Sequence, residues 1–533
     1  MPVSRCLLFG TLFALAGASL AEEPAAREVP MKTMLPSPVV PDGLGVNIHF
    51  TDAKAGEAEM MADAGFGIVR MDFHWGSIER QKGQYDFSAY DRLMKTLDAH
   101  RIRALFILDY GNKLYDNGDA PRTDEGRQAF ARWVAASVEH FQGRGILWEI
   151  WNEPNLGHFW KPRPNAEDYA KLSIAAGQAL RETAPGEIYF GAATSTIDLR
   201  FLEDTFKHGA LAQWDAVSVH PYRQQPPETV VPEYRALRVL IRRHAPAGRS
   251  FPILSGEWGY SAAWNGYNAE RQGKYLPRQW LVNLANDVHT SIWYDWHDDG
   301  QDPKDPEHHF GTVAFKYYKD RTPCYDPKPA FVAAKTLIAA LKGFRFDKRL
   351  TVGDERNHVL LFRRGDELRL AAWTTAGEPR EVALPTGAGR FKAIDYLGAE
   401  RTLEAGAEGL TLALTDTPLY LVPERASELL RLAAAWERVP LEFWHAAGTG
   451  PAHLSLKLAN PLDRAIALRS TPGFPGGTLA AGQTATWTQE VSVTRAIESV
   501  PVRFELEVEG LGRLAQDSLV VVANPLRATA LPP

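Results

Sequence analysis

The chain has 533 residues, of which 45% are hydrophobic and 23% charged, with a formal net charge of −6 and a pI near 6.2. This length predicts more than one domain, and this composition is typical of a globular protein and not of a disordered one. Because the balance is acidic and no block of Lys or Arg occurs, neither nucleic acid nor an anionic membrane is expected as a partner.

The first 21 residues have the pattern of a signal peptide. Arg5 precedes the apolar run Leu7–Leu15, and the small residues Ser19 and Ala21 stand just before Glu22. This run is shorter than the ~20 residues that a membrane-spanning helix needs, although an N-terminal anchor is the alternative. We therefore expect residues 1–21 to be cleaved, the mature form not to insert into a membrane, and the protein to be secreted or periplasmic.

After a polar, Pro-rich linker at residues 22–42, strand-like and helix-like stretches alternate over residues 43–342. Apolar runs predict strands at 44–50, 68–73, 104–110, 146–151, 188–193, 216–222, 253–257 and 291–296. Helix-like runs lie between them, for example at 55–64, 87–100, 126–141, 166–183, 231–244 and 275–286, and 327–341 closes the series. Eight such repeats predict a (β/α)8 TIM barrel. A doubly wound open sheet is the alternative, but no Gly-x-Gly-x-x-Gly follows the first strand.

The pattern changes after residue 342. Residues 343–424 contain short alternating strands, such as 359–362, 368–373 and 410–414, which predict a small β-sandwich. A helical stretch at 425–437 then precedes another β-rich stretch from 441 to 522, so residues 425–533 are expected to form a second β-rich domain. The predicted fold is therefore an α/β barrel followed by C-terminal β-sandwich domains.

Two of the predicted strands end in a glutamate. The run 147–151 leads into Asn152, Glu153 and Pro154, and the run 252–256 leads into Glu257. Pro154 cannot donate to a sheet and biases the residue before it toward extended backbone. The first strand is therefore expected to stop there, with Glu153 in an extended conformation and facing the space above the strand end.

In a TIM barrel the active site lies at the carboxyl ends of the strands. Seven of the eight predicted strands carry, at or near this end, one or two residues that could take part in catalysis or bind a sugar. These residues are His49, Arg70, Asp72, Tyr110, Asn152, Glu153, His220, Tyr222, Glu257 and Trp296.

Two carboxylates across a barrel mouth are suited to cleaving a glycosidic bond. Glu153 would then be the acid/base with a raised pKa, and Glu257 the nucleophile, kept ionised by the Tyr222 hydroxyl or by Arg70. Asn152 is placed to donate to the sugar 2-hydroxyl. Among the aromatic residues, Trp296 is the predicted platform for stacking on a sugar ring.

Some of these residues have structural alternatives. Arg70 and Asp72 would also fit a buried ion pair, and His220 would fit a core histidine. The segment 297–309 is rich in Asp and His, but its spacing is not that of an EF-hand and no His-Glu-x-x-His occurs. It is interpreted as a polar loop; no metal and no cofactor are predicted, and whether this loop binds a cation stays open.

Three strings resemble strands four, six and seven of the clan A retaining glycoside hydrolases: Trp-Asn-Glu-Pro-Asn at 151–155, Val-His-Pro-Tyr at 219–222 and Ser-Gly-Glu-Trp-Gly at 255–259. The resemblance implies that Glu153 is the acid/base and Glu257 the nucleophile. Residues 69–75, followed by Ile78 and Glu79, are similar to strand two of family 39, which includes β-xylosidases and exopolysaccharide hydrolases; family 5 is nearly as similar. The resemblance covers about residues 43–342 and the first sandwich.

The sequence therefore predicts a secreted O-glycosyl hydrolase that acts on a β-linked poly- or oligosaccharide, of xylan, glucan or exopolysaccharide type, by double displacement. The carbohydrate is the only partner expected, and the oligomeric state is not predicted. The alternative is a non-catalytic carbohydrate-binding protein on a hydrolase-like barrel.

Overall fold

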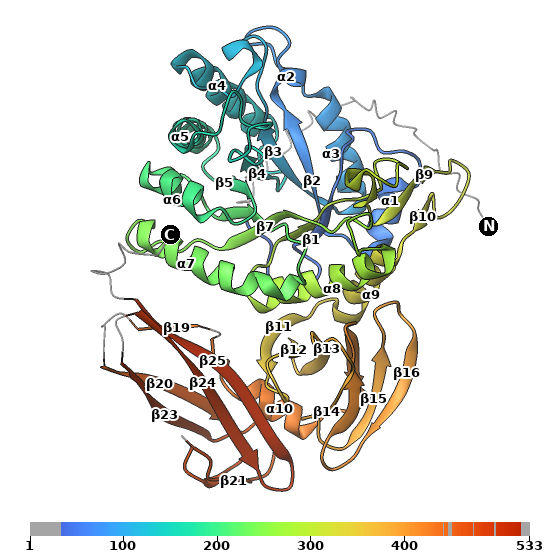
Figure 1. The fold of residues 1–533 in the computed structure, drawn as a ribbon, viewed down its shortest axis with the longest axis vertical. Helices are drawn as coiled ribbons and strands as arrows, with labels where there is room; N and C mark the ends of the chain where they lie inside the picture. Colours follow the sequence, from blue (N-terminus) through green and yellow to red (C-terminus); the bar gives the residue numbers. More distant parts are fainter. Residues whose placement is uncertain (1–33, 441, 446–449, 473, 495–496, 524–533) are drawn as a thin grey trace, which may run out of the picture. The chain divides into compact units, whose positions relative to one another are not determined.

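The computed structural model describes residues 34–440, 442–445, 450–472, 474–494 and 497–523 (Figure 1). The predicted signal peptide lies outside the described residues. Among those described, no helix has both the length and the apolar character needed to cross a membrane.

Eight parallel strands form a closed barrel in which each strand pairs with the next and β8 pairs with β1. The predicted TIM barrel is therefore confirmed. Most strand residues are buried on both faces, as expected for a sheet covered by helices. The strands are β1 (Leu44–Asn47), β2 (Ile68–His74), β3 (Arg103–Asp109), β4 (Leu147–Ile150), β5 (Ile188–Ser195), β6 (Val217–His220), β7 (Ile253–Trp258) and β8 (Ser291–Trp293).

Helices surround this barrel (Figure 1). They are α1 (Glu57–Ala64), α2 (Trp75–Ile78), α3 (Ser88–His100), α4 (Asp124–His140), α5 (Ala166–Thr183), α6 (Leu199–Lys207), α7 (Val231–His244), α8 (Ala269–Ala285) and α9 (Pro329–Leu341). Short 3-10 turns lie at η1 (Asp116–Gly118), η2 (Ala210–Ala212), η3 (Pro227–Val230) and η4 (Pro306–His309), and a hairpin of β9 (Val313–Tyr317) and β10 (Tyr325–Pro327) follows β8.

The one-turn helix α2 was not predicted, and two longer helices also differ from the predicted elements. Helix α6 was not among them, although Asp198 caps it by accepting a hydrogen bond from the Phe201 amide. Helix α8 begins at Ala269, earlier than the predicted residue 275, because Asn268 caps it in the same way. Both are Asx N-caps, a signal that is readable in sequence.

The inside of the barrel changes character along the strands. Ile68, Leu105 and Leu147 belong to an apolar cluster of inward-facing residues contributed by several strands. Because side chains alternate along a strand, the residues two positions further on point to the same side. On β2 and β4 these are Arg70 and Glu149, so the apolar layer is followed directly by a charged one.

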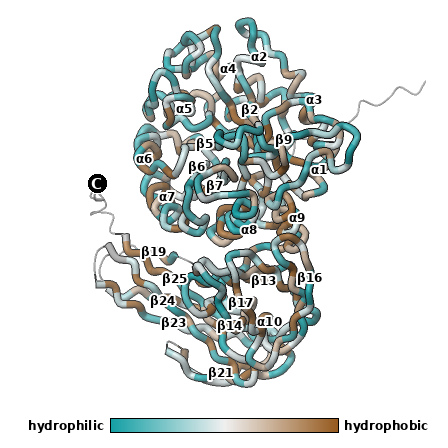
Figure 2. Tube along the Cα trace, turned by 45° about the vertical axis from the view of Figure 1, so that its right-hand side comes forward, coloured by the Kyte–Doolittle hydropathy of each residue, from teal (hydrophilic) through white to brown (hydrophobic). Residues whose placement is uncertain are grey.

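The remaining described residues form two β-rich regions. The first has a six-stranded sheet in the order β11-β12-β13-β18-β15-β16 and a two-stranded sheet of β14 and β17. The second has a five-stranded sheet in the order β19-β25-β24-β21-β22 and a two-stranded sheet of β20 and β23. Helix α10 (Glu428–Ala435), which is largely apolar like α9 (Figure 2), lies between the two regions in the sequence.

The strand bounds in these regions are β11 (Arg345–Leu350), β12 (Asn357–Arg364), β13 (Glu367–Thr374), β14 (Arg380–Leu384), β15 (Gly389–Ile394), β16 (Glu400–Ala405), β17 (Leu410–Leu414), β18 (Leu419–Pro423), β19 (Phe443–His445), β20 (Gly450–Ala459), β21 (Ile466–Arg469), β22 (Gly477–Leu479), β23 (Thr484–Val493), β24 (Ile497–Val508) and β25 (Gly512–Ala523). The first region contacts the barrel through Glu228 in η3, which accepts hydrogen bonds from Trp373 Nε1 at 2.8 Å and from Arg278 Nη2 at 2.6 Å.

Candidate active site

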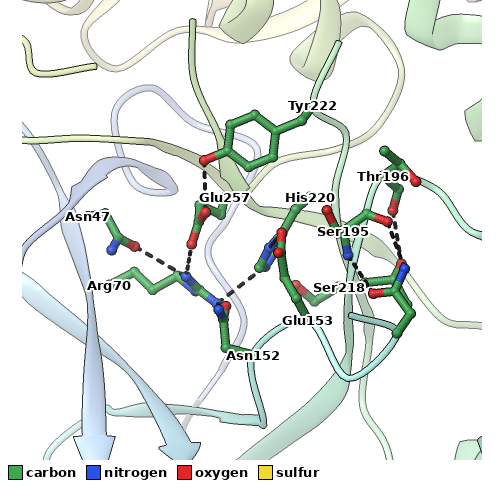
Figure 3. Close-up of polar contacts among 12 residues, drawn as sticks. Asn47, Arg70, Asn152, Glu153, Ser195, Thr196, Ser218, His220, Tyr222 and Glu257 are labelled. Carbon is green, nitrogen blue, oxygen red and sulfur yellow. Dashed lines mark hydrogen bonds and ion pairs between the residues drawn. The ribbon is translucent and has the colours of Figure 1, made fainter. Parts of the chain in front are cut away.

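Arg70 is the centre of a hydrogen-bond network at the carboxyl ends of the barrel strands (Figure 3). Its Nε donates to Glu149 Oε2 at 2.6 Å, and its Nη1 donates to Glu257 Oε2 at 2.5 Å. Nη1 also lies 3.3 Å from Asn47 Oδ1, and Nη2 lies 2.8 Å from Asn152 Oδ1. The buried guanidinium therefore ties strands β1, β2, β4 and β7 together through its planar set of donors.

This network decides between the two interpretations of Arg70. The predicted contact with Glu257 is present, whereas the alternative ion pair with Asp72 is not formed. The partner that the sequence reasoning missed is Glu149, which is fully buried in β4 and also accepts a hydrogen bond from Ser218 Oγ. A glutamate within a short apolar strand indicates a buried cation, and that signal was available in the sequence.

Glu257 has a donor on each carboxylate oxygen. The Tyr222 hydroxyl donates to Oε1 at 2.8 Å, and Arg70 donates to Oε2. Burial and the neighbouring carboxylate raise the pKa of Tyr222, so the phenol keeps its proton and remains a donor. Both predicted contacts are thus observed, and together they hold the Glu257 carboxyl group in a fixed orientation.

Glu153 lies in a different environment. Burial raises its pKa to about 7, although a hydrogen bond from Ser195 and the charge of Arg70 act in the opposite direction. Its Oε1 lies 3.0 Å from His220 Nδ1. A carboxyl group with this pKa exchanges its proton near neutral pH, which is what a general acid/base requires.

The contacts of His220 fix its tautomer. Its Nε2 lies 3.2 Å from Arg70 Nη2, and because a guanidinium only donates, this nitrogen must be the acceptor. The proton is therefore on Nδ1, from which it is donated to Glu153 Oε1. Burial, aided by the charge of Arg70, lowers the pKa of His220 to about 4, so the ring is neutral. His220 thus occupies Oε1 of Glu153.

The backbone around Glu153 is not extended, which corrects the prediction made from Pro154. The φ angle of Glu153 is 43° and that of Trp151 is 63°, both in the left-handed region. The Glu153 amide donates to the Ala193 carbonyl at 2.9 Å, and Asn155 exchanges hydrogen bonds with the Ser195 backbone at 2.9 and 3.0 Å. These contacts to β5 override the local preference set by the proline.

Gly256 shows why Glu257 follows a glycine. A Cβ atom at this position would clash with Ser218 Oγ and would lie 2.7 Å from Glu149 Oε1. Any side chain here would therefore displace the buried carboxylate that holds Arg70.

The two catalytic candidates lie close together. One carboxylate oxygen of Glu153, one of Glu257 and a ring nitrogen of His220 all lie within 4.8 Å of one another. Such a triplet has metal-ligand spacing, but Arg70 already places a positive charge against both Glu257 and His220, where a cation would have to bind. The arrangement is better suited to proton transfer and nucleophilic attack.

Three other predicted residues lie at the rim of this site. Tyr110 is half-buried and its ring stacks on Phe159, with 5.8 Å between centroids. His49 is exposed and its Nε2 lies 3.3 Å from Asp295 Oδ2. Asp72 is half-buried at the end of the inward-facing row that begins with Ile68 and Arg70.

Trp296 is not at the site, so its predicted role as a sugar platform is corrected. Its indole is 0% exposed and donates to Glu57 Oε1 at 3.0 Å, on the side of helix α1. Strand β8 ends at Trp293, and the chain then turns, so the alternation used to orient Trp296 no longer holds. Tyr294, whose ring contacts those of His49 and Tyr222, is the aromatic residue at this strand end.

Known proteins share this architecture. The family model described as Cellulase (glycosyl hydrolase family 5) matches residues 44–300. A β-xylosidase from Geobacillus stearothermophilus is 27% identical over 199 residues, a match that covers 30% of this chain and 38% of that enzyme. The chain thus spans well under half of the length of that curated relative.

Solved structures agree with this match. A family 39 glycoside hydrolase from the gut symbiont Bacteroides cellulosilyticus WH2 has a TM-score of 0.63 and 25% identity, covering 72% of this chain and 81% of that one. A GH39 β-xylosidase from Caulobacter crescentus has the same fold, with a TM-score of 0.55 and 20% identity over 74% of this chain and 98% of that one. In barrel, motifs and these matches the chain is similar to clan A glycoside hydrolases, most of all those of family 39.

Proposed function

We propose that this protein is an exported retaining β-glycoside hydrolase that cleaves a β-linked poly- or oligosaccharide by double displacement. The observation that carries the proposal is the pair Glu153 and Glu257, whose oxygens come within 4.8 Å of each other. Burial raises the pKa of Glu153, whereas Glu257 accepts hydrogen bonds from Tyr222 and Arg70. Carboxyl groups of retaining enzymes are about 5–5.5 Å apart, whereas those of inverting enzymes are about 6.5–9.5 Å apart to admit a water molecule.

In the first step Glu257 attacks the anomeric carbon while Glu153 protonates the leaving oxygen. The glycosidic C–O bond breaks, the leaving sugar departs with its new hydroxyl, and a glycosyl ester remains on Glu257. Arg70 and Tyr222 hold the attacking carboxylate in place. Because the Oδ1 of Asn152 is engaged by Arg70, its amide NH₂ is the group that can donate to the sugar 2-hydroxyl.

In the second step Glu153, now ionised, removes a proton from a water molecule that attacks the same carbon. The ester bond to Glu257 breaks, and both carboxyl groups return to their starting protonation states. Since Glu153 must begin each cycle protonated and its pKa is about 7, we expect kcat/KM to fall about tenfold per pH unit above pH 7.

The sugar is proposed from the relatives and the sequence. A β-xylosidase is among the similar proteins, so β-1,4-xylosides are the first substrates to try, followed by β-glucans and bacterial exopolysaccharides. Export rests on residues 1–21, which have the charge and length of a signal peptide.

The test is product release, measured by mass spectrometry, from a panel of β-linked poly- and oligosaccharides. Wild type, Glu153→Gln and Glu257→Gln are compared, with Glu381→Gln on the surface of β14 as a matched control. We expect cleavage by wild type and by the control, and loss of cleavage with either site variant. Cleavage that survives both site substitutions would refute the assignment, and glycan binding without cleavage by any form would favour the carbohydrate-binding alternative.

A further inference from the structure

A second group of carboxyl side chains lies at the barrel mouth and takes no part in the mechanism above. Asp72 follows Arg70 by two positions on β2, so both point to the barrel interior. Asp109 ends the neighbouring strand β3, where it pairs with His74 in the parallel register. Asp295 and Asp299 follow β8, next to β1 in the closed barrel.

Asp109 is a buried acid without a conventional partner. It is 0% exposed, and neither of its carboxyl oxygens has a hydrogen-bond donor among the described residues. Burial, together with the charge of Asp72, raises its pKa well above the usual range. Asp72 is the neighbouring carboxyl group, and its proximity favours the protonated form of Asp109.

Asp72 has unused capacity to accept hydrogen bonds. In the part of the chain that the structure describes, its carboxylate forms no ion pair, because Arg70 is held by Glu149 and Glu257 and because His49 contacts Asp295. It is half-buried, unlike Asp109 behind it. A partly desolvated carboxylate at a barrel mouth is stable when a ligand supplies donors.

The adjacent group extends this acidic wall. His49, Asp295 and Asp299 each offer one atom within 4.8 Å of the others. Partial desolvation of the ring lowers the pKa of His49. The hydrogen bond and charge of Asp295, followed by the charges of Asp299 and Asp72, outweigh this effect and raise the pKa to about 9. One imidazolium thus faces three carboxylates, so this side of the mouth carries net negative charge next to the nucleophile.

We propose that Asp72, backed by Asp109 and flanked by His49, Asp295 and Asp299, forms a sugar-binding subsite that selects units presenting hydrogen-bond donors, as hydroxyl or ammonium groups, and rejects units carrying a carboxylate. This deepens the proposed hydrolase function and depends on it. Asp72 contacts the sugar, whereas Asp109 is a positioning residue that acts through Asp72. The enzyme therefore acts on neutral or amine-bearing glycans and not on polyuronates.

The experiment compares four β-1,4-linked hexasaccharides: xylohexaose, cellohexaose, fully de-N-acetylated chitohexaose, and cellohexaose oxidised to the uronate at C6. Wild type is expected to cleave at least one of the first three with a kcat/KM ten or more times that for the uronate. Asp72→Asn should lower kcat/KM on the best substrate about 10- to 100-fold, the range of one hydrogen bond to a charged group, and should reduce the discrimination against the uronate. Asp63→Asn on the exposed face of α1 is the matched control.

Variants of Asp109 distinguish a role in positioning Asp72 from a general contribution to folding. Asp109→Asn keeps a neutral donor toward Asp72 and should retain activity within about threefold, whereas Asp109→Leu should reproduce the loss and the relaxed selectivity of Asp72→Asn. Preference for the uronate, or an Asp72→Asn enzyme with unchanged rate and selectivity, would overturn this inference while leaving the hydrolase function intact. Cleavage of none of the glycans, or cleavage that persists in Glu257→Gln, would instead overturn the proposed function and the subsite with it.

Discussion

The barrel interior has two layers built by the same strands, and they obey different rules. In the lower layer Ile68, Leu105 and Leu147 are fully buried and apolar. Two positions further along β2 and β4, the same face presents Arg70 and Glu149, equally buried but charged. The lower layer gains stability from removing apolar surface from water, whereas the upper layer must satisfy each charge with hydrogen bonds.

The backbone conformation also distinguishes the mouth of the barrel from the apolar layer below it. The left-handed φ angles of Trp151, Glu153 and Ala193 all occur where β4 and β5 reach the mouth. Such angles cost about 1–3 kcal/mol per residue and persist only where surrounding structure enforces them. The apolar layer therefore supports a mouth that is strained and highly charged, and substitutions in the two layers should fail in different ways.

The largest effect is expected for Arg70→Met. The change leaves Glu149 and Glu257 buried without their cation, which should cost about 3–5 kcal/mol of unfolding free energy. It should also lower kcat/KM by about 10³-fold or more, because the nucleophile loses a fixed donor. Urea unfolding and product release measure the two effects. A stable Arg70→Met enzyme with normal rates would contradict the role assigned to this network.

Leu105→Ala tests the lower layer. Truncating a fully buried leucine should cost about 2–5 kcal/mol of stability while kcat and KM of the folded fraction stay within about threefold of wild type. Ala383→Gly, on β14 outside the barrel, controls for a generic loss of side-chain volume. A large loss of kcat without loss of stability would show that the lower layer contributes to catalysis and not only to stability.

Much of this division was predictable from sequence. The eight apolar runs locate every barrel strand, and the Asn-Glu and Gly-Glu strand ends locate Glu153 and Glu257 at the mouth. Glu149 was not predicted as a partner of Arg70, because its strand is buried on both faces and alternation gives no signal there. The signal that the sequence did offer is a glutamate within a short apolar run. Trp296 was misplaced for the opposite reason: alternation was extended past the end of β8.

The pH dependence of stability should isolate the cost of burying Glu153. Below pH 4.5 folded and unfolded chains are both protonated at this residue. Between pH 4.5 and 7 the unfolded chain loses the proton first, so unfolding free energy should fall by up to about 3 kcal/mol as pH rises. Because the Gln side chain has no proton to lose, the unfolding free energy of Glu153→Gln should not show this fall. Denaturant unfolding of both proteins at pH 4.5 and 7.5 measures the change in unfolding free energy with pH. An equal change in wild type and variant would mean that Glu153 has an ordinary pKa.

The smallest effect is expected for Trp296→Phe. Losing the hydrogen bond to Glu57 and part of the indole should cost about 1–2 kcal/mol of stability. Because the ring is buried away from the mouth, KM should not change, whereas Tyr294→Ala should raise KM. A raised KM for Trp296→Phe with Tyr294→Ala unchanged would restore Trp296 as the sugar platform.

The proposed mechanism depends on a covalent bond between Glu257 and the sugar. The most direct measurement is incubation with an activated 2-deoxy-2-fluoro β-glycoside of the sugar that the product panel identifies, followed by proteolysis and mass spectrometry of the labelled peptide. We predict a single fluoroglycosyl adduct on Glu257, formed by wild type and absent from Glu257→Gln. An adduct on another carboxylate, or turnover with inversion and no adduct, would contradict the account.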